Sequence, residues 1–176
     1  MPTLQTFTAG QVLTAAQLNT LQSYVGVVQV KSTAKTDTFT MSSATFADVT
    51  GLSVSITPTS ASNKILISAV ISAGMDSGNT QWFARLVRDT TNIALGDAAS
   101  NRTRVSIGSY SAATTTLQTA AVMFLDSPAT TSSVTYKIQI AAQSANAVYV
   151  NRSHTDTDAS TFARSISTIT VFEVTP

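Results

Sequence analysis

The sequence predicts an all-β protein, a jelly-roll-like β-sandwich preceded by a short N-terminal α-helix. In residues 52–57 the apolar side chains fall on every second residue, which places them on one face of a pleated strand. About ten such short segments follow one another at intervals of roughly 8 to 15 residues. No helical period appears beyond residue 25. This pattern is typical of stacked antiparallel sheets.

The composition is polar but poor in charge. Charged residues are 11% of the 176 residues, the net charge is +1 and the chain has no cysteine. Ser and Thr together make up about 30%, whereas charged residues alone reach roughly 25% in an average soluble domain. We expect no nucleic-acid partner, because a basic field is lacking, and no membrane span, because the apolar runs are too short. A strand-rich chain with few charges favours an oligomer that covers its sheet edges.

Residues 1–26 are predicted to be a separate unit, an extended arm and a short helix that serve in docking or trimerisation. Thr14-Ala15-Ala16-Gln17 matches the capping box, so the helix is expected to start at Ala15. A helix of about ten residues is below the roughly 12 to 15 at which isolated helices become even marginal, so its apolar stripe must pack on a partner. The residues predicted to form this docking or oligomer interface are Leu4, Phe7, Leu13, Leu18, Leu21 and Tyr24.

Residues 27–176 are predicted to form the sandwich body. The segments 52–57 and 64–72 are separated by a short polar loop, and we expect them to pair as antiparallel neighbours. Residues 64–72 and 117–125 are almost continuously apolar, which predicts strands covered on both faces. Segment 81–88 carries apolar side chains on both sides of its pleat, which indicates one face toward the core and one toward a neighbouring subunit.

The later segments are also predicted as strands. Residues 102–107 and 134–140 alternate, and in the second of these the inward side chains are expected to be Val134, Tyr136, Ile138 and Ile140. The last strand, residues 166–174, is expected to be paired within the body.

Residue types suited to catalysis or metal binding are sparse, and we expect no enzyme, no cofactor and no dedicated metal site. His154 is the only histidine, and no serine lies in a Gly-x-Ser-x-Gly elbow. Asp156 and Asp158 have the spacing of a calcium loop but lack its remaining ligands, and this leaves calcium as a minor alternative. A polysaccharide hydrolase, a second alternative, would need two carboxylates at a suitable separation. Its candidates are Asp76, Asp97, Asp126, Asp156, Asp158 and Glu173.

Arginine outnumbers lysine, and its rigid fork is favoured in bidentate pairs at interfaces. Arg85, in the segment that is apolar on both faces, is expected to need a carboxylate partner, because an unpaired buried charge is costly. The residues predicted to form salt bridges between strands or between subunits are Arg85, Asp97, Arg102, Arg104, Arg152, Asp156 and Asp158.

Three stretches together resemble tailed-bacteriophage virion proteins, in particular small fibre-like and head-decoration proteins of aquatic phages of the cyanophage type. They are residues 6–19, residues 48–58 with 64–66, and residues 149–171. The similarity covers most of the chain, and residues 109–116 are the least characteristic. It implies a structural virion component assembled in the host cytoplasm, usually a homotrimer, with a docking N-terminal segment and a projecting β body. The family supplies no catalytic residues.

The leading hypothesis is therefore a non-enzymatic head fibre or capsid decoration (cement) protein, a homotrimer bound to other capsid or tail proteins through its N-terminal segment. The alternative is a tail-fibre or receptor-binding tip that holds a host surface glycan between loops 74–80, 96–102 and 151–160. Three aromatic residues could line such a groove, although they are more often core or interface residues: Trp82, Tyr110 and Tyr149.

Overall fold

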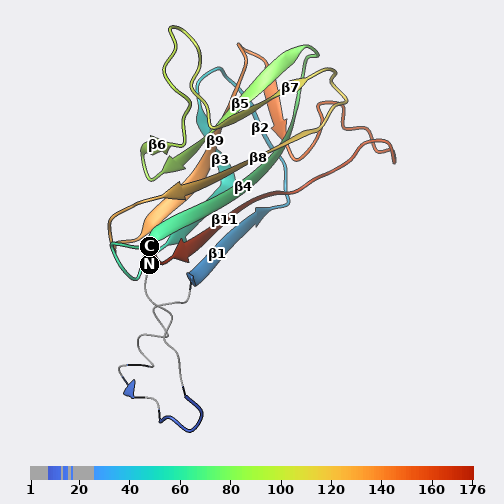
Figure 1. Cartoon of the computed structure of the whole chain (residues 1–176). Helices are drawn as coiled ribbons and strands as arrows, with labels where there is room; N and C mark the ends of the chain where they lie inside the picture. The colour runs from blue at the N-terminus through green and yellow to red at the C-terminus, as the bar shows by residue number, and fades with distance from the viewer. Residues whose placement is uncertain (1–7, 13, 16, 18–25) are drawn as a thin grey trace.

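The computed structural model describes residues 8–12, 14, 15, 17 and 26–176, and the described residues contain eleven β-strands (Figure 1). The strands are β1 (Val27–Lys35), β2 (Phe39–Ser42), β3 (Ala47–Ile56), β4 (Lys64–Met75), β5 (Thr80–Arg88), β6 (Thr91–Ile93), β7 (Ile107–Ser111), β8 (Gln118–Asp126), β9 (Val134–Ala142), β10 (Ala147–Val150) and β11 (Ser167–Val174). Among these residues, no helix is long and apolar enough to cross a membrane.

The strands form two antiparallel sheets that pack face to face. In the first sheet the order is β1-β11-β4-β10-β2, with β8 on the other edge of β4. β11 pairs with the first part of β4 and β10 with its last residues, so the two share one edge. In the second sheet the order is β3-β9-β5-β6, and β7 pairs with β5 beside β6. The predicted all-β sandwich is confirmed.

The predicted pairing of segments 52–57 and 64–72 is wrong. These segments belong to β3 and β4, which lie in different sheets. One edge of β4 is taken by β8 and the other by β11 and β10, so no edge is free for β3. The loop between them crosses from one sheet to the other. The strand predicted at residues 102–107 also begins later, at Ile107 of β7.

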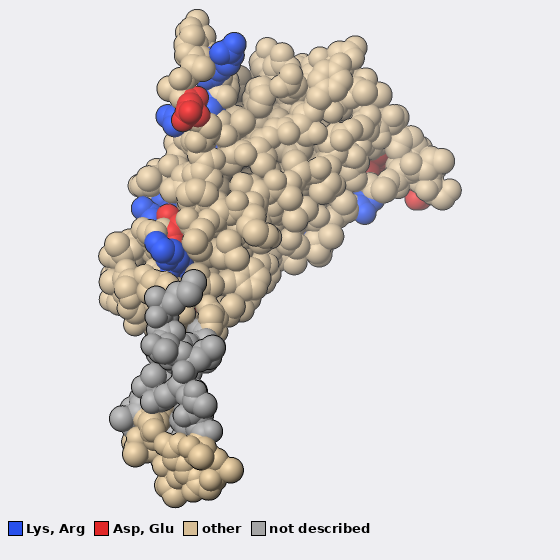
Figure 2. Space-filling model, in the orientation of Figure 1, with Lys and Arg blue, Asp and Glu red and all other residues tan. Residues whose placement is uncertain are grey.

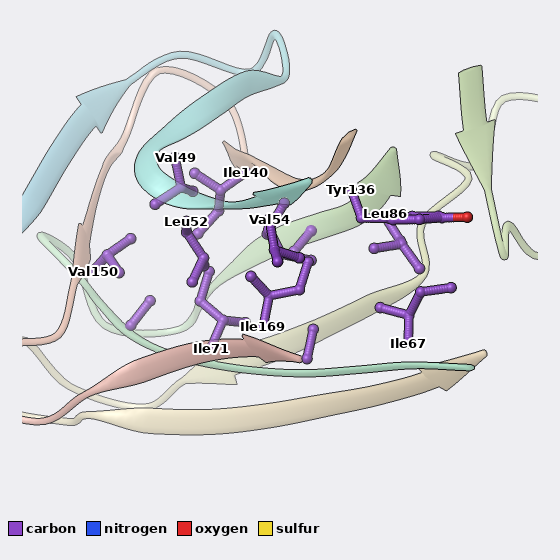
Figure 3. Packing of buried hydrophobic residues seen from close by; sticks show 14 of the residues in the cluster. Val49, Leu52, Val54, Ile67, Ile71, Leu86, Tyr136, Ile140, Val150 and Ile169 are labelled. Carbon is purple, nitrogen blue, oxygen red and sulfur yellow. The ribbon is translucent and has the colours of Figure 1, made fainter. Parts of the chain in front are cut away.

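The core fills the space between the two sheets (Figure 3). From the first sheet, Ile67, Ile71 and Ile169 point toward Leu52 and Val54 of the second sheet in that view. Each is at most 6% exposed, and fully burying such a side chain contributes about 1.5 to 3 kcal/mol. The predicted inward residues of β9 are confirmed, since all are buried: Val134, Tyr136, Ile138 and Ile140.

The predicted burial of both faces holds for only part of β4 and not for β8. The inward side chains of β8, such as Phe124, pack on the core, but Met123 is 69% exposed and Leu125 is 49% exposed. In β4 the outward side chains are half-buried as far as Val70, and only residues 71–75 are buried without a break. There the loops around Thr116 and Ser153 lie against Gly74 and cover the outer side of the strand.

At the N-terminus, the predicted capping box is present. The Thr14 amide donates to the Gln17 side-chain oxygen at 2.9 Å, and the Gln17 amide donates to the Thr14 hydroxyl at 3.3 Å. Ala15 and Gln17 have helical backbone conformation. The helix itself is not shown, because residues 13, 16 and 18–25 lie outside the described residues. The division into residues 1–26 and 27–176 stays a prediction.

Candidate functional site

The outer face of the first sheet carries almost no charge. Directly paired residues of neighbouring strands point to the same side of a sheet, so the register identifies the outward side chains. One row runs from Val30 of β1 through Phe172 of β11 and Leu66 of β4 to Leu125 of β8. We call this surface the uncharged face. Its outward side chains are Val30, Ser32, Ala34, Phe172, Thr170, Thr168, Leu66, Ser68, Val70, Leu125, Met123 and Ala121.

Several apolar side chains of the uncharged face are open to solvent. Met123 is 69% exposed, and Val30 and Leu125 are each 49% exposed. Lys64, at the margin, donates to the Ser127 hydroxyl at 2.8 Å. Figure 2 shows the surface over β1, β11, β4 and β8 as a continuous area without charged residues, with the charges gathered around its rim. Exposed apolar side chains that are grouped on one face favour contact with another molecule.

The outer face of the second sheet is built differently, from a network of polar and charged side chains. Asp48 accepts a hydrogen bond from Lys137 at 2.7 Å and another from the Gln139 amide at 2.6 Å. Burial raises the pKa of Asp48, but these hydrogen bonds outweigh it and hold the pKa below its usual value. The charges of this face are therefore paired with one another, whereas the polar side chains of the uncharged face are only Ser and Thr hydroxyls.

Arg85 belongs to this polar network, where an amide and an aromatic ring take the place of the expected carboxylate. Its Nε donates to Gln139 Oε1 at 2.8 Å, and its guanidinium lies 4.3 Å from the centre of the Phe46 ring. A cation over an aromatic face is a favourable contact. The predicted subunit contact of this side of β5 stays a prediction.

The other residues predicted in salt bridges are partly brought together. Arg152 Nη1 lies 3.9 Å from Asp156 Oδ2, and Arg164 donates to the same carboxylate. Arg104 Nε donates to the Gly96 carbonyl at 2.7 Å. Within the described part of the chain, the remaining three residues are in no ion pair: Asp97, Arg102 and Asp158. Whether any of them pairs between subunits stays a prediction.

The docking residues predicted in the N-terminal segment lie outside the described residues. These are Leu4, Phe7, Leu13, Leu18, Leu21 and Tyr24. Val12, which is described, is 88% exposed.

The structure contains two buried polar clusters that the sequence did not predict. Glu173, fully buried in β11, accepts hydrogen bonds from the Thr59 amide at 2.7 Å, from Asn63 at 2.7 Å and from Gln29. Burial raises its pKa, but the hydrogen bonds from Gln29, Asn63 and Thr59 outweigh this and lower the pKa to about 2. The cluster ties the β3–β4 loop to the edge formed by β1 and β11.

The second cluster centres on Asp126 at the end of β8. Arg88 Nη1 lies 2.8 Å from Asp126 Oδ2, and the Tyr136 hydroxyl donates to the same oxygen at 2.7 Å. Burial, and after it the Asp126 carboxylate, raise the pKa of Tyr136 above its usual value. Because Arg88 and Tyr136 come from the second sheet, the cluster joins the two sheets.

The aromatic residues considered for a sugar groove are scattered. Trp82 is fully buried in the core, and the Tyr149 ring lies 4.2 Å from the Arg152 guanidinium. Tyr110 is 50% exposed on the outer face of the second sheet. The described residues enclose no pocket and hold no group of three or more His, Asp or Glu side chains placed to bind a metal ion.

Comparisons with known proteins found no matching family model and no matching curated protein. Among solved structures, the chain is similar to "Structure of infectious bursal disease virus Gx strain", with a TM-score of 0.44, 13% identity, and coverage of 84% of this chain and 37% of that one. It is also similar to "Crystal structure of infectious bursal disease virus VP2 subviral particle", with a TM-score of 0.38, 11% identity, and coverage of 84% and 42%. The chain thus spans less than half the length of either protein.

Proposed function

We propose that this protein is a non-enzymatic structural component of a virion, a homotrimeric head fibre or capsid decoration (cement) protein anchored through residues 1–26. The observation that carries the proposal is the uncharged face. Its exposed Met123, Leu125 and Val30 favour burial against protein, and covering the exposed part of each contributes about 1 kcal/mol. A surface of this kind serves assembly rather than solubility.

The strand order supports a jelly roll. With the short strands set aside, the first sheet runs β1-β11-β4-β8 and the second β3-β9-β5-β7. Along the chain these eight strands change sheet at every step except from β5 to β7, which pair with each other. Two four-stranded antiparallel sheets connected in this way form the double-sheet jelly roll, an architecture used in viral capsid and lectin domains.

The use of the acidic side chains supports a non-enzymatic role. Asp48, Asp126, Asp156 and Glu173 are each held by cations or amides within the fold. A carboxylate held in this way stabilises the structure, whereas general acid catalysis needs one whose pKa is raised toward the working pH.

The assembly proposal is tested by sedimentation of the full chain. We expect a particle of three times the 18.4 kDa chain mass. Met123→Lys places a charge on the uncharged face and should shift the protein toward monomer. The matched control is Tyr110→Lys on the outer face of the second sheet, where a half-exposed side chain is replaced, and it should stay trimeric. A wild-type monomer, or equal behaviour of the two variants, would contradict the proposal.

The virion role is tested on particles. Deleting residues 1–25 should leave a folded body, checked by circular dichroism, that fails to enter particles. Normal incorporation of the truncated chain would reject the anchoring role, and intact particles that never contain the full chain would reject the virion role. A map of the intact particle would distinguish head from tail.

Tyr110 favours one second candidate, a tail-fibre tip that recognises a host surface glycan. Its exposed ring lies beside Gln81 across the strand pair, and its hydroxyl is hydrogen-bonded to Asn79. An exposed ring flanked by amides presents both an apolar surface and polar groups to a sugar. Binding of the full chain to a glycan array, lost in Tyr110→Ala, would support this candidate, and no binding would reject it.

A further inference from the structure

We propose that residues 13–25 of each chain pack across the uncharged face of a neighbouring copy, so that exchanged N-terminal segments hold the trimer together. This inference rests on the proposed function and names the contact through which the chains assemble.

The absence of charge on both surfaces favours this packing. The first charged side chain in the sequence is Lys31, so the whole N-terminal segment carries only uncharged side chains. The twelve outward side chains of the uncharged face are uncharged as well. Two such surfaces meet without burying an unpaired charge, which would be costly. The outer face of the second sheet offers no such match, because Asp48, Lys137 and Arg85 lie on it.

The N-terminal segment joins the body close to the uncharged face. The body begins at Gly26 and Val27, where β1 pairs with the end of β11. The most apolar row of the uncharged face, from Val30 to Leu125, crosses the sheet near this same end. The N-terminal segment therefore leaves the body beside the surface that we expect its copies to cover.

The length of the expected helix matches the width of the uncharged face. Residues 15–25, continued as the helix that the capping box begins, would be about 16 Å long at 1.5 Å per residue. The outer strands of a row of four lie about 14 Å apart at the usual spacing of about 4.8 Å. One such helix spans the width of the sheet. Because a helix this short is unstable alone, the face would also supply the partner that it needs.

Both surfaces are exposed within a single chain. Thr14 and Ala15, at the start of the segment, are exposed, and so are Met123 and Leu125. In a lone chain these parts of the segment do not cover the face. Packing on a neighbouring copy would bury both surfaces and make every chain equivalent, as a closed symmetric oligomer requires.

The test uses disulfide trapping, for which a chain without cysteine gives a clean background. Full-length chains carrying Leu21→Cys with one tag are co-expressed with chains carrying Met123→Cys with another tag, and the assembled protein is oxidised. We expect most of the mixed assemblies to contain a disulfide between differently tagged chains. The matched control pairs Leu21→Cys with Tyr110→Cys on the opposite sheet and should give only background cross-linking.

The possible outcomes separate this inference from the proposed function. Equal cross-linking in test and control, or no cross-linking in a protein that still sediments as a trimer, would overturn the segment exchange and leave the trimer standing. A chain carrying both Leu21→Cys and Met123→Cys that closes a disulfide only within itself would replace exchange by packing on its own body. A monomeric wild type would overturn the proposed assembly as well.

Discussion

Asn63 donates a hydrogen bond to the Glu173 carboxylate across 2.7 Å, and both side chains are buried. The loop that carries Asn63 crosses from the second sheet to the first, and Glu173 lies in the last strand. The contact therefore joins segments far apart in the sequence at the end of the body where the N-terminal segment enters. It ties the integrity of this end to the ionisation of one carboxyl group.

Stability at acid pH should depend on Glu173. Its pKa is about 2 in the folded protein against an ordinary value of 4.5, so its contribution is complete above about pH 5 and is lost as the pH falls from 4.5 toward 2. The shift corresponds to about 3 kcal/mol. Glu173→Gln should lower the free energy of unfolding at pH 7 by a similar amount and less at pH 3.

Urea unfolding at pH 7, 5 and 3, at a fixed protein concentration, measures this effect. Asp97→Asn removes the same charge from an exposed position and serves as the control. A Glu173→Gln variant whose loss of stability does not shrink at low pH would show that the carboxylate does not act through its ionisation.

The Arg88–Asp126 pair should stabilise the contact between the sheets. Arg88→Met keeps the packing of the stem but leaves Asp126, whose side chain is 8% exposed, without its cation. We expect a loss of about 2 to 4 kcal/mol, somewhat less than for a fully buried pair because the Arg88 side chain is 24% exposed. Chemical denaturation compares this variant with Arg102→Met, an exposed control that should stay within about 0.5 kcal/mol of wild type. Equal stability of the two variants would refute the role of the pair.

Gly74 should be needed for the close approach of two loops to β4. A Cβ atom there would lie 2.8 Å from Ser153 Cα and 2.9 Å from the Thr116 carbonyl oxygen, both backbone atoms. Gly74→Ala should therefore push the loops away and cost about 1 to 3 kcal/mol. At Gly96 a Cβ meets nothing within 4 Å, so Gly96→Ala should leave the melting temperature nearly unchanged. A Gly74→Ala protein that melts with wild type would mean that the loops can retreat freely.

Strand positions and facing could be predicted from the sequence because they depend on local alternation. The period of two between Val134 and Ile140 identifies the inner face of β9, whose residues are buried. The same alternation does not indicate which strands pair with one another. A short polar loop separates residues 52–57 from residues 64–72, as in a β-hairpin. The strand β4 nevertheless pairs with β8, β10 and β11.

Exposed and covered apolar faces were also indistinguishable in the sequence. In β8 the alternating sets Val122, Phe124 and Met123, Leu125 are equally apolar, but only the first set meets the core. One sequence feature could have indicated the uncharged face. The outward-facing residues of the last strand, Thr168, Thr170 and Phe172, are all uncharged. The burial of Glu173 in a hydrogen-bonded cluster could not be predicted from the sequence. Its hydrogen-bond donors come from residues 29, 59 and 63, which are far away in the chain.

The Thr175 amide donates to the Gly26 carbonyl, so the last strand finishes where the first begins. A peptide or fluorescent cargo fused after residue 176 would thus lie beside the start of β1, next to the N-terminal segment that we propose as the anchor. The exposed turn at residues 143–145 lies beyond the other end of β4, roughly 36 Å away along a twelve-residue strand. If the protein is anchored as we propose, that turn is the insertion point for a foreign epitope that leaves the anchored end undisturbed.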